Sequence, residues 1–211
     1  MKYLQLILSV LAVLLLVSTE GWCADFQKGW NAFSNEEYVT AFQEWKTLAE
    51  QGDTKSQFLV GAMYSNGIGV SPDHKEAVRW YRLAAEHAYA PAQNNLGLMY
   101  YKGQGVIQDD IIARKWLQFS AEQGVPEAQF LLGWMYYKGQ GFPQDHKQAA
   151  YSYRLAADQG LVFAQTNLGL MYVKGLGVPQ EYKKAFLWLK LAAVQGEGIA
   201  QFNLGLLYLR G

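Results

Sequence analysis

This chain of 211 residues contains few cysteines and prolines, and it has no excess of charge of either sign. Cys23 is the single cysteine, so no disulfide can form within the chain and its stability must come from packing. Lys and Arg total 18, as do Asp and Glu, and no run of like charge stands out. A neutral surface lacks the counterion release that drives nucleic-acid binding, so we expect no nucleic-acid partner.

Long apolar runs are also missing, with one exception at the N-terminus. The exception extends from Leu4 to Val17 behind Lys2, and polar residues follow it. A helix of this length measures about 21 Å, short of the roughly 30 Å hydrocarbon core of a bilayer. The pattern is typical of a secretory signal, so we predict that residues 1–24 are a cleaved signal peptide. The mature protein would be periplasmic or secreted, without a stable membrane span; an uncleaved anchor is the alternative.

Glycine and apolar residues are abundant, and the glycines are periodic. Hydrophobic residues make up 51% and aromatic residues 15% of the chain, which favours a continuous core over disorder. Five glycines, each in a variant of Leu-Gly-x-Met-Tyr, follow one another at intervals of 36 residues: Gly61, Gly97, Gly133, Gly169 and Gly205. A fixed period of this length predicts tandem copies of one helical unit.

One copy, from Pro91 to Gly124, predicts a helical hairpin. Gly103 is expected to end the first helix in a left-handed cap, and Asp109 to cap the second helix, which Gly124 ends. The predicted buried stripes are Ala92, Leu96, Met99 and Tyr100 in the first helix, and Ala113, Trp116, Leu117, Ser120 and Ala121 in the second. Small residues such as Gly133 should let the two helix backbones approach closely, with aromatic rings filling the space between them.

Two features that suggest chemistry are better explained by structure. The loops at 67–69, 103–105, 139–141 and 175–177 read Gly-x-Gly, but they close a helix and lack the Lys-Ser/Thr of a phosphate loop, so we predict a capping role. His74 and His146 share one repeat position two copies apart, about 30 to 40 Å by helix spacing, which is too far for one metal ion. We interpret both as exposed residues at helix starts and predict no catalytic, cofactor-binding or metal site.

Two segments carry a resemblance to a known family. They are 92–105, Ala-Gln-Asn-Asn-Leu-Gly-Leu-Met-Tyr-Tyr-Lys-Gly-Gln-Gly, and 77–85, Ala-Val-Arg-Trp-Tyr-Arg-Leu-Ala-Ala. Their repetition resembles the Sel-one-like repeat family, a near relative of tetratricopeptide repeats, over residues 26–211. The resemblance implies an all-α fold, a right-handed α/α superhelical solenoid of helix-turn-helix repeats with period 36. It also implies a protein-binding adaptor that is not an enzyme and needs no cofactor.

The two ends depart from this pattern. Residues 25–53 are predicted to form a tetratricopeptide-like hairpin, because Gly29 precedes Ala41 by 12 residues, against 16 between Gly61 and Ala77. Residues 54–211 are predicted to form about four full Sel-one-like repeats and a terminal half repeat. A solenoid normally ends in a polar cap. Either further repeats follow in a longer protein, or the apolar end associates with another surface, including a second copy of the chain.

A candidate binding surface lies on the first helix of each repeat, opposite the buried stripe. The outward positions there are too apolar and too varied for a simply solvated face. The predicted partner-binding residues are Asn95, Leu98, Tyr101, Lys102, Phe130, Trp134, Tyr137, Lys138, Asn167 and Lys174. In the family that the chain resembles, these helices line a concave groove, where aromatic, amide and ammonium groups suit a peptide. The alternative is that the stripe packs between neighbouring repeats.

From these observations we predict a non-enzymatic, exported scaffold that binds a partner protein or peptide in the groove of the first helices. The alternative from another class is a cell-wall-directed hydrolase, or the activator of one, that recognises peptidoglycan. That alternative requires a deep cleft with paired acids, whereas a scaffold needs only an open groove.

Overall fold

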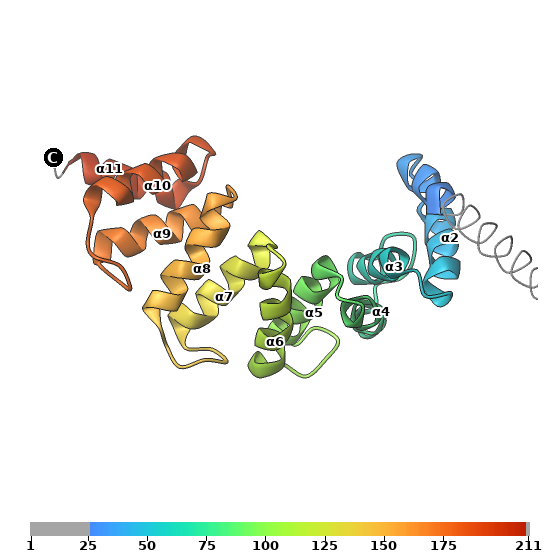
Figure 1. The fold of residues 1–211 in the computed structure, drawn as a ribbon. Coiled ribbons are helices and arrows are strands. Elements are labelled where there is room, and N and C mark those ends of the chain that lie inside the picture. The colour runs from blue at the N-terminus through green and yellow to red at the C-terminus, as the bar shows by residue number, and fades with distance from the viewer. Residues whose placement is uncertain (1–25, 210–211) are drawn as a thin grey trace, which may run out of the picture. The chain divides into compact units, whose positions relative to one another are not determined.

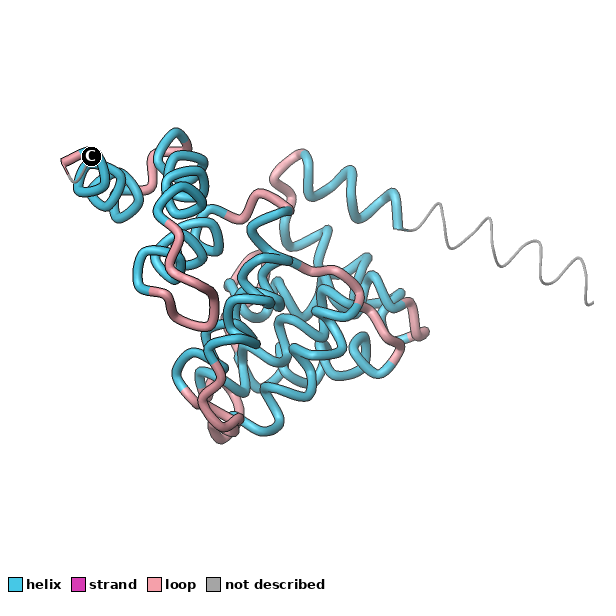
Figure 2. Tube along the Cα trace, turned by 60° about the vertical axis from the view of Figure 1, so that its left-hand side comes forward, coloured by secondary structure: helices cyan, strands magenta, loops and turns pink. Residues whose placement is uncertain are grey.

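The structure is a computed structural model that describes residues 26–209, all of them in helices or the loops that join them (Figure 1). A helix of residues 26–34 precedes α2. The helices that follow are α2 (Tyr38–Glu50), α3 (Thr54–Asn66), α4 (His74–Glu86), α5 (Ala90–Lys102), α6 (Asp110–Glu122), α7 (Pro126–Lys138), α8 (His146–Asp158), α9 (Val162–Lys174), α10 (Tyr182–Val194) and α11 (Gly198–Tyr208). Figure 2 shows no strand in the described part of the chain. The predicted fold class, an all-α fold of helix-turn-helix repeats, is confirmed.

The chain divides into two compact units, Met1–His87 and Ala88–Gly211. In the first unit α2 packs against α3, and α3 against α4. In the second unit each helix from α6 to α11 packs against the helix before it. The predicted signal peptide, residues 1–24, lies outside the described residues. From residue 26 to residue 209, the chain holds no helix of the length and hydropathy that a membrane span requires.

Capping residues set the ends of the repeat helices. Asp109 Oδ1 accepts hydrogen bonds of 2.9 Å from the backbone N–H groups of Ile111 and Ile112, at the start of α6. Asp73 and Asp145 cap α4 and α8 in the same way. The first helices end in left-handed glycines with φ between 66° and 72°: Gly67, Gly103, Gly139 and Gly175. The predicted capping role of the Gly-x-Gly loops is thus confirmed.

In three of the four loops, the second glycine makes a close backbone contact. A Cβ atom on Gly141 would lie 2.6 Å from the carbonyl oxygen of Asp110, in the first turn of α6. Gly69 and Gly177 approach the first turns of α2 and α8 in the same manner. These loops therefore attach one repeat to the preceding second helix, where no side chain fits.

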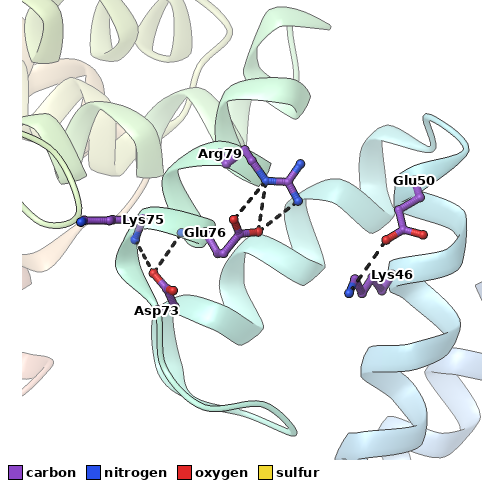
Figure 3. A network of polar contacts seen from close by, with 6 residues as sticks. All are labelled: Lys46, Glu50, Asp73, Lys75, Glu76 and Arg79. Atoms are coloured by element: carbon purple, nitrogen blue, oxygen red, sulfur yellow. Dashed lines mark hydrogen bonds and ion pairs between the residues drawn. The ribbon is translucent and has the colours of Figure 1, made fainter.

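Exposed polar contacts lie along the helices of the first unit, as Figure 3 shows. Asp73 caps α4, and Glu76 forms an ion pair of 3.0 Å with Arg79 one turn later. Lys46 and Glu50 pair along α2 at 3.9 Å. Exposed pairs of this kind contribute at most about 1 kcal/mol each, so core packing carries the stability of the unit.

Aromatic side chains hold the first hairpin together. Trp45 is buried, and the ring centroids of Trp30 and Phe33 lie 6.4 and 5.6 Å from its own. The indole Nε1 donates to the carbonyl of Phe26 at 3.3 Å. A Cβ atom on Gly29 would lie 2.5 Å from that nitrogen, so only glycine allows the ring to rest on the helix.

In the later hairpins, the periodic glycines meet a large side chain of the second helix. A Cβ atom on Gly133 would lie 2.7 Å from Cδ1 of Tyr153, so the tyrosine ring rests on the backbone of α7. The same contact recurs at Gly61, Gly97 and Gly169. The predicted close approach of the two helices is therefore confirmed at four of the five glycines. A Cβ atom on Gly205 would meet no described atom within 4 Å.

Buried glutamines connect successive hairpins. Gln129 of α7 donates to the carbonyl of Ala121 at 3.2 Å and accepts from Gln159, at the end of α8, at 2.8 Å. One side chain thus joins three helices, and its buried amide is satisfied on both sides. The link between two glutamines recurs in the pairs Gln93–Gln123, at 2.7 Å, and Gln165–Gln195, at 3.0 Å.

This pattern is interrupted at the end of the first unit. Gln57 donates to the carbonyl of Ala49, but its Oε1 is buried and has no hydrogen-bond partner within the described part of the chain. His87 stands where later repeats have the donating glutamine, and its Nδ1 contacts the carbonyl of Leu83 at 2.9 Å. Ala88 adopts a left-handed φ of 57°, in the place that glycine occupies in other hairpins: Gly52, Gly124, Gly160 and Gly196. A non-glycine residue is strained in that conformation.

Candidate functional site

The structure brings four of the predicted binding residues together where α5 and α7 present their outward sides. Trp134 and Tyr137 stack with ring centroids 6.2 Å apart and planes inclined by 22°. The Trp134 Nε1–H donates to the hydroxyl of Tyr101 at 3.1 Å, and that hydroxyl donates to Oε1 of Gln140 at 3.2 Å. The ammonium group of Lys138 lies 4.8 Å from the centroid of the Trp134 ring. These contacts fix the aromatic rings in place and set a positive charge over the indole face.

A cleft of about 260 Å³, which we call the α7–α9 cleft, opens beside this cluster. Trp134 and Tyr137 line one side of it, and Asn167 and Lys174 line the other. The remaining lining residues are Tyr153, Leu170, Met171 and Leu176. The lining therefore combines aromatic and aliphatic surface with an amide, an ammonium and two phenols, and it includes no carboxylate of the described residues.

Tyr153 of α8 is the most buried polar residue of this lining. The residue is 1% exposed, and its hydroxyl has no hydrogen-bond partner among residues 26–209. Burial raises the pKa of Tyr153, and the nearby hydroxyls of Tyr137 and Tyr101 raise it further. The phenol is thus protonated at neutral pH, and its buried hydroxyl has a hydrogen to donate. An unsatisfied buried hydroxyl costs about 1 to 3 kcal/mol, which an acceptor on a bound partner would remove.

His146 lies against the other side of the aromatic cluster. Its ring centroid is 5.2 Å from that of Tyr137, and its Nδ1 is buried without a partner in the described region. The interpretation of His74 and His146 as exposed helix starts is therefore wrong for His146, which is half-buried, while His74 is exposed. The difference arises because the outward aromatic ring of Tyr137 is present in only one of the two repeats.

The other predicted residues lie outside the α7–α9 cleft. Phe130 packs on Tyr153, with ring centroids 5.6 Å apart, so it contacts a lining residue of the cleft without lining the cleft itself. Leu98 is half-buried, and the side-chain Oδ1 of Asn95 accepts a hydrogen bond of 3.2 Å from Nδ2 of Asn94. Lys102 is exposed at the end of α5. The alternative that the stripe packs between repeats thus describes Leu98 and Phe130 better than a role in binding.

Sequence reasoning missed three residues that complete the site: Tyr153, His146 and Gln140. Tyr153 belongs to a second helix and has the spacing of a core residue, so the pattern assigned it to packing. The corresponding position holds tyrosine at Tyr81 and Tyr153 and leucine at Leu117 and Leu189. Because Tyr81 packs on Gly61 as Tyr153 packs on Gly133, the residue type at this position gave no distinct signal of a binding role.

Comparisons with known proteins agree with the fold. The Sel1 repeat model matches five successive segments, residues 54–89, 90–125, 126–161, 162–197 and 198–211. The chain belongs to the Sel1 repeat family. Sel1 repeat proteins generally act as scaffolds for protein interactions and are typically not catalytic. Among curated proteins, none matches the chain significantly.

Solved structures give the same result. A protective antigen present in uropathogenic Escherichia coli strains, which displays an SLR fold, is 35% identical, with a TM-score of 0.85 over 89% of this chain and 41% of its own. A Sel1 repeat protein from Oxalobacter formigenes is 38% identical, with a TM-score of 0.74 over 81% of this chain and 49% of its own. This chain thus spans less than half the length of either relative. Cysteine-rich protein B of Helicobacter pylori, at 22% identity and a TM-score of 0.51 over 63% of this chain and 96% of its own, shares the fold alone.

Proposed function

We propose that the protein is a non-enzymatic scaffold that binds a partner protein or peptide at the α7–α9 cleft and the aromatic surface beside it. The observation that carries this proposal is the hydroxyl of Tyr153. It is a buried donor without a partner in the described chain, and Tyr153 belongs to the lining of a cleft that Trp134, Tyr137 and Lys174 border. A bound acceptor would satisfy it.

The size and lining of the cleft favour a protein partner. A volume of about 260 Å³ lies below the roughly 300 to 1,000 Å³ typical of small-molecule pockets, and suits one or two side chains of a larger partner. Aromatic residues and cations are frequent anchors at protein interfaces. The absence of carboxylates from the described lining favours a neutral or acidic segment over a basic one. The hydrolase alternative needs paired acids, and the described residues that line the cleft supply none.

We also propose that the partner is met outside the cytoplasm. Residues 1–24 have the pattern of a cleaved signal peptide, and the mature chain would begin between Trp22 and Asp25. Residues 25–53 would then form an N-terminal hairpin ahead of the repeats of residues 54–211. Mass spectrometry of the native protein tests this, and an intact Met1 on a cytoplasmic product would contradict it.

Capture of partners from an extracytoplasmic extract tests the binding proposal. The wild-type protein is compared with Tyr153→Phe and with Lys174→Gln, and Tyr151→Phe on the exposed side of α8 is the matched control. We expect one captured protein to be depleted with the two cleft variants and retained with the control. Equal capture by all four proteins would place binding elsewhere.

A further inference from the structure

The second helices α6, α8 and α10 form troughs on a different side from the α7–α9 cleft, and these troughs differ in chemistry. The trough along α6 and α8 has a volume of about 400 Å³, and its lining includes Gln118, Glu122, Gln148 and Ser152. The trough along α10, which reaches α8 through Arg154, has a volume of about 600 Å³ and is lined by Leu187, Trp188, Leu191 and Val194. We call the second one the α10 trough. The first trough also includes Leu132, Tyr136 and Phe142 in its lining, so the same architecture presents a trough of mixed polarity and, one repeat later, an apolar one.

The apolar stripe of α10 is not required for packing. Leu187, Leu191 and Val194 are 59%, 48% and 74% exposed, and their spacing puts them on one side of the helix. The buried side of α10 consists of other residues, Ala185, Leu189 and Ala192. The positions that match the exposed stripe hold Lys115, Phe119 and Glu122 in α6, and Tyr151, Leu155 and Asp158 in α8. A second helix therefore folds with charged residues at these positions, and packing does not account for the apolar ones in α10.

Cations border the α10 trough. Arg154, Lys184 and Lys190 belong to its lining, and no carboxylate of the described residues does. Glu181 pairs with Lys184 at 3.0 Å from just outside, and the guanidinium of Arg154 donates to the hydroxyl of Tyr172. The Lys190 ammonium lies 5.9 Å from the centroid of the Phe186 ring. The trough is thus apolar along its length and positive at its edges.

We propose that the α10 trough is a second docking site, and that its occupant is an amphipathic helix of a partner protein with an apolar stripe flanked by acidic residues. Leu187, Leu191 and Val194 extend over two helical turns, which matches the i, i+3/i+4, i+7 anchors of a helix that lies in an apolar groove. The cations at the edges select acidic flanks, because opposite charges steer association and like charges oppose it. A concave trough fits a rod-shaped helix better than a flat membrane surface.

Model peptides test the proposal directly. Two labelled peptides of about 18 residues, long enough to sample helix, carry the same leucine stripe with either glutamate or lysine flanks. Fluorescence anisotropy measures their binding to the whole chain. We expect the glutamate peptide to bind at least about tenfold more tightly than the lysine peptide, and Leu187→Gln with Leu191→Gln to weaken it by at least about tenfold. Lys184→Glu with Lys190→Glu should reverse the preference between the two peptides.

The matched control is Phe119→Gln with Tyr151→Gln, which changes exposed residues of the equivalent α6 and α8 positions and should leave peptide binding unaltered. Circular dichroism confirms that each variant is folded. Failure of the glutamate peptide to bind at about 100 µM, or equal binding by all variants, would overturn the proposal. So would two other results that depend on Leu187 and Leu191, namely sedimentation with phosphatidylcholine–phosphatidylglycerol vesicles without peptide binding, or a dimer that dissociates in the Leu187→Gln, Leu191→Gln variant.

Discussion

The α7–α9 cleft and the α10 trough belong to the same unit and would recognise partners by different means. In the cleft, Trp134 and Tyr137 are held by stacking and hydrogen bonds, and the hydroxyl of Tyr153 would give a direction to binding. In the trough, Leu187 and Leu191 offer apolar surface without a buried polar group among the described lining residues. The first arrangement selects by the geometry of a donor, and the second by the amphipathic character and charge of a helix.

The contrast between buried and exposed positions explains how one repeat produces both surfaces. Ala113, Ala149 and Ala185 occupy one position of α6, α8 and α10, are fully buried and are identical. Two residues further along, at an exposed or nearly exposed position, the three helices hold Lys115, Tyr151 and Leu187. Close packing restricts the first set to alanine, since even one added methylene changes the stability of a packed core. The second set is free to diverge, and it sets the apolar character of the α10 trough.

The largest expected effect separates the two surfaces. Trp134→Ala with Tyr137→Ala should abolish binding of the captured partner, because aromatic hot spots typically contribute at least about 2 kcal/mol each. Helicity should stay nearly unchanged by circular dichroism, although thermal stability should fall because both rings pack against the buried cluster. Binding of the glutamate peptide to the α10 trough should survive. Loss of both binding activities would show that the two surfaces are not independent.

The next effect tests the buried framework that the two surfaces share. Gly133→Val should lower the free energy of unfolding by about 2 to 3 kcal/mol, because its side chain would overlap the ring of Tyr153 and valine is a poor helix former. Gly205→Val is the matched control and should change it by less than about 1 kcal/mol, since no described atom lies within 4 Å of a Cβ there. Urea denaturation of both variants measures the difference. Equal losses would mean that the contact with Tyr153 is not tight.

A smaller effect, a gain in stability, is expected at His87, where the series of buried glutamine pairs is interrupted. His87→Gln with Ala88→Gly should raise the free energy of unfolding by about 1 to 2 kcal/mol. Glycine relieves the left-handed strain at position 88, and glutamine supplies a donor to the buried Oε1 of Gln57. Urea denaturation measures the gain in the free energy of unfolding. The two single variants, His87→Gln and Ala88→Gly, show how much of the gain each substitution contributes. A loss of stability would indicate that His87 has a partner role that the glutamine cannot replace.

Charge at the first-helix surface should have a weaker effect. Lys102→Gln, Lys138→Gln and Lys174→Gln should each weaken partner binding by less than about 1 kcal/mol, and the difference should shrink at high salt because exposed charges are screened. Lys174→Gln should have the largest effect, since Lys174 alone of the three lines the cleft. Calorimetric titration at low and high salt measures this order. An unchanged affinity for all three would remove the lysines from the site.

The smallest effect concerns alkaline pH. The pKa of Tyr153 is raised above its ordinary value of 10.0, mainly by burial, so the folded chain keeps this proton at a pH where the unfolded chain releases it. The stabilisation that results from this pKa difference is fully present below the pKa of the unfolded chain. It is lost as the pH rises through the pKa of the folded chain. Wild type should therefore lose about 0.4 kcal/mol relative to Tyr153→Phe between neutral pH and pH 10. Denaturation midpoints at the two pH values measure the difference, and parallel pH profiles would contradict it.

Much of the fold was predictable because the residues that determine the helix ends recur in each repeat. Gly103 and Asp109 recur with their neighbours at a fixed period, so the helix ends follow from capping chemistry alone. The interruption at His87 and Ala88 was not predicted, because its meaning depends on the buried amide of Gln57, which the structure reveals.

The candidate site was predictable in part. Trp134, Tyr137, Asn167 and Lys174 were named from the outward side of the first helices, and they share one cleft. Tyr153 was missed because a ring that packs on Gly133 has the spacing of a core residue, and the position of its hydroxyl depends on how α7 and α9 diverge. The stripe of Leu187 and Leu191 was missed for another reason, since the sequence analysis placed the binding surface on the first helices alone.

Tyr153→Phe is the most direct test of the proposed binding site, because the variant removes one oxygen atom and keeps the ring. The account predicts that the free energy of unfolding is unchanged or rises by up to about 1 kcal/mol at neutral pH, since the lost hydroxyl has no partner in the described chain. Affinity for the captured partner should fall by about tenfold in calorimetric titration, while Tyr151→Phe changes neither quantity. A variant that is destabilised by more than about 1 kcal/mol and binds as the wild type does would show that the hydroxyl serves the fold and not a partner.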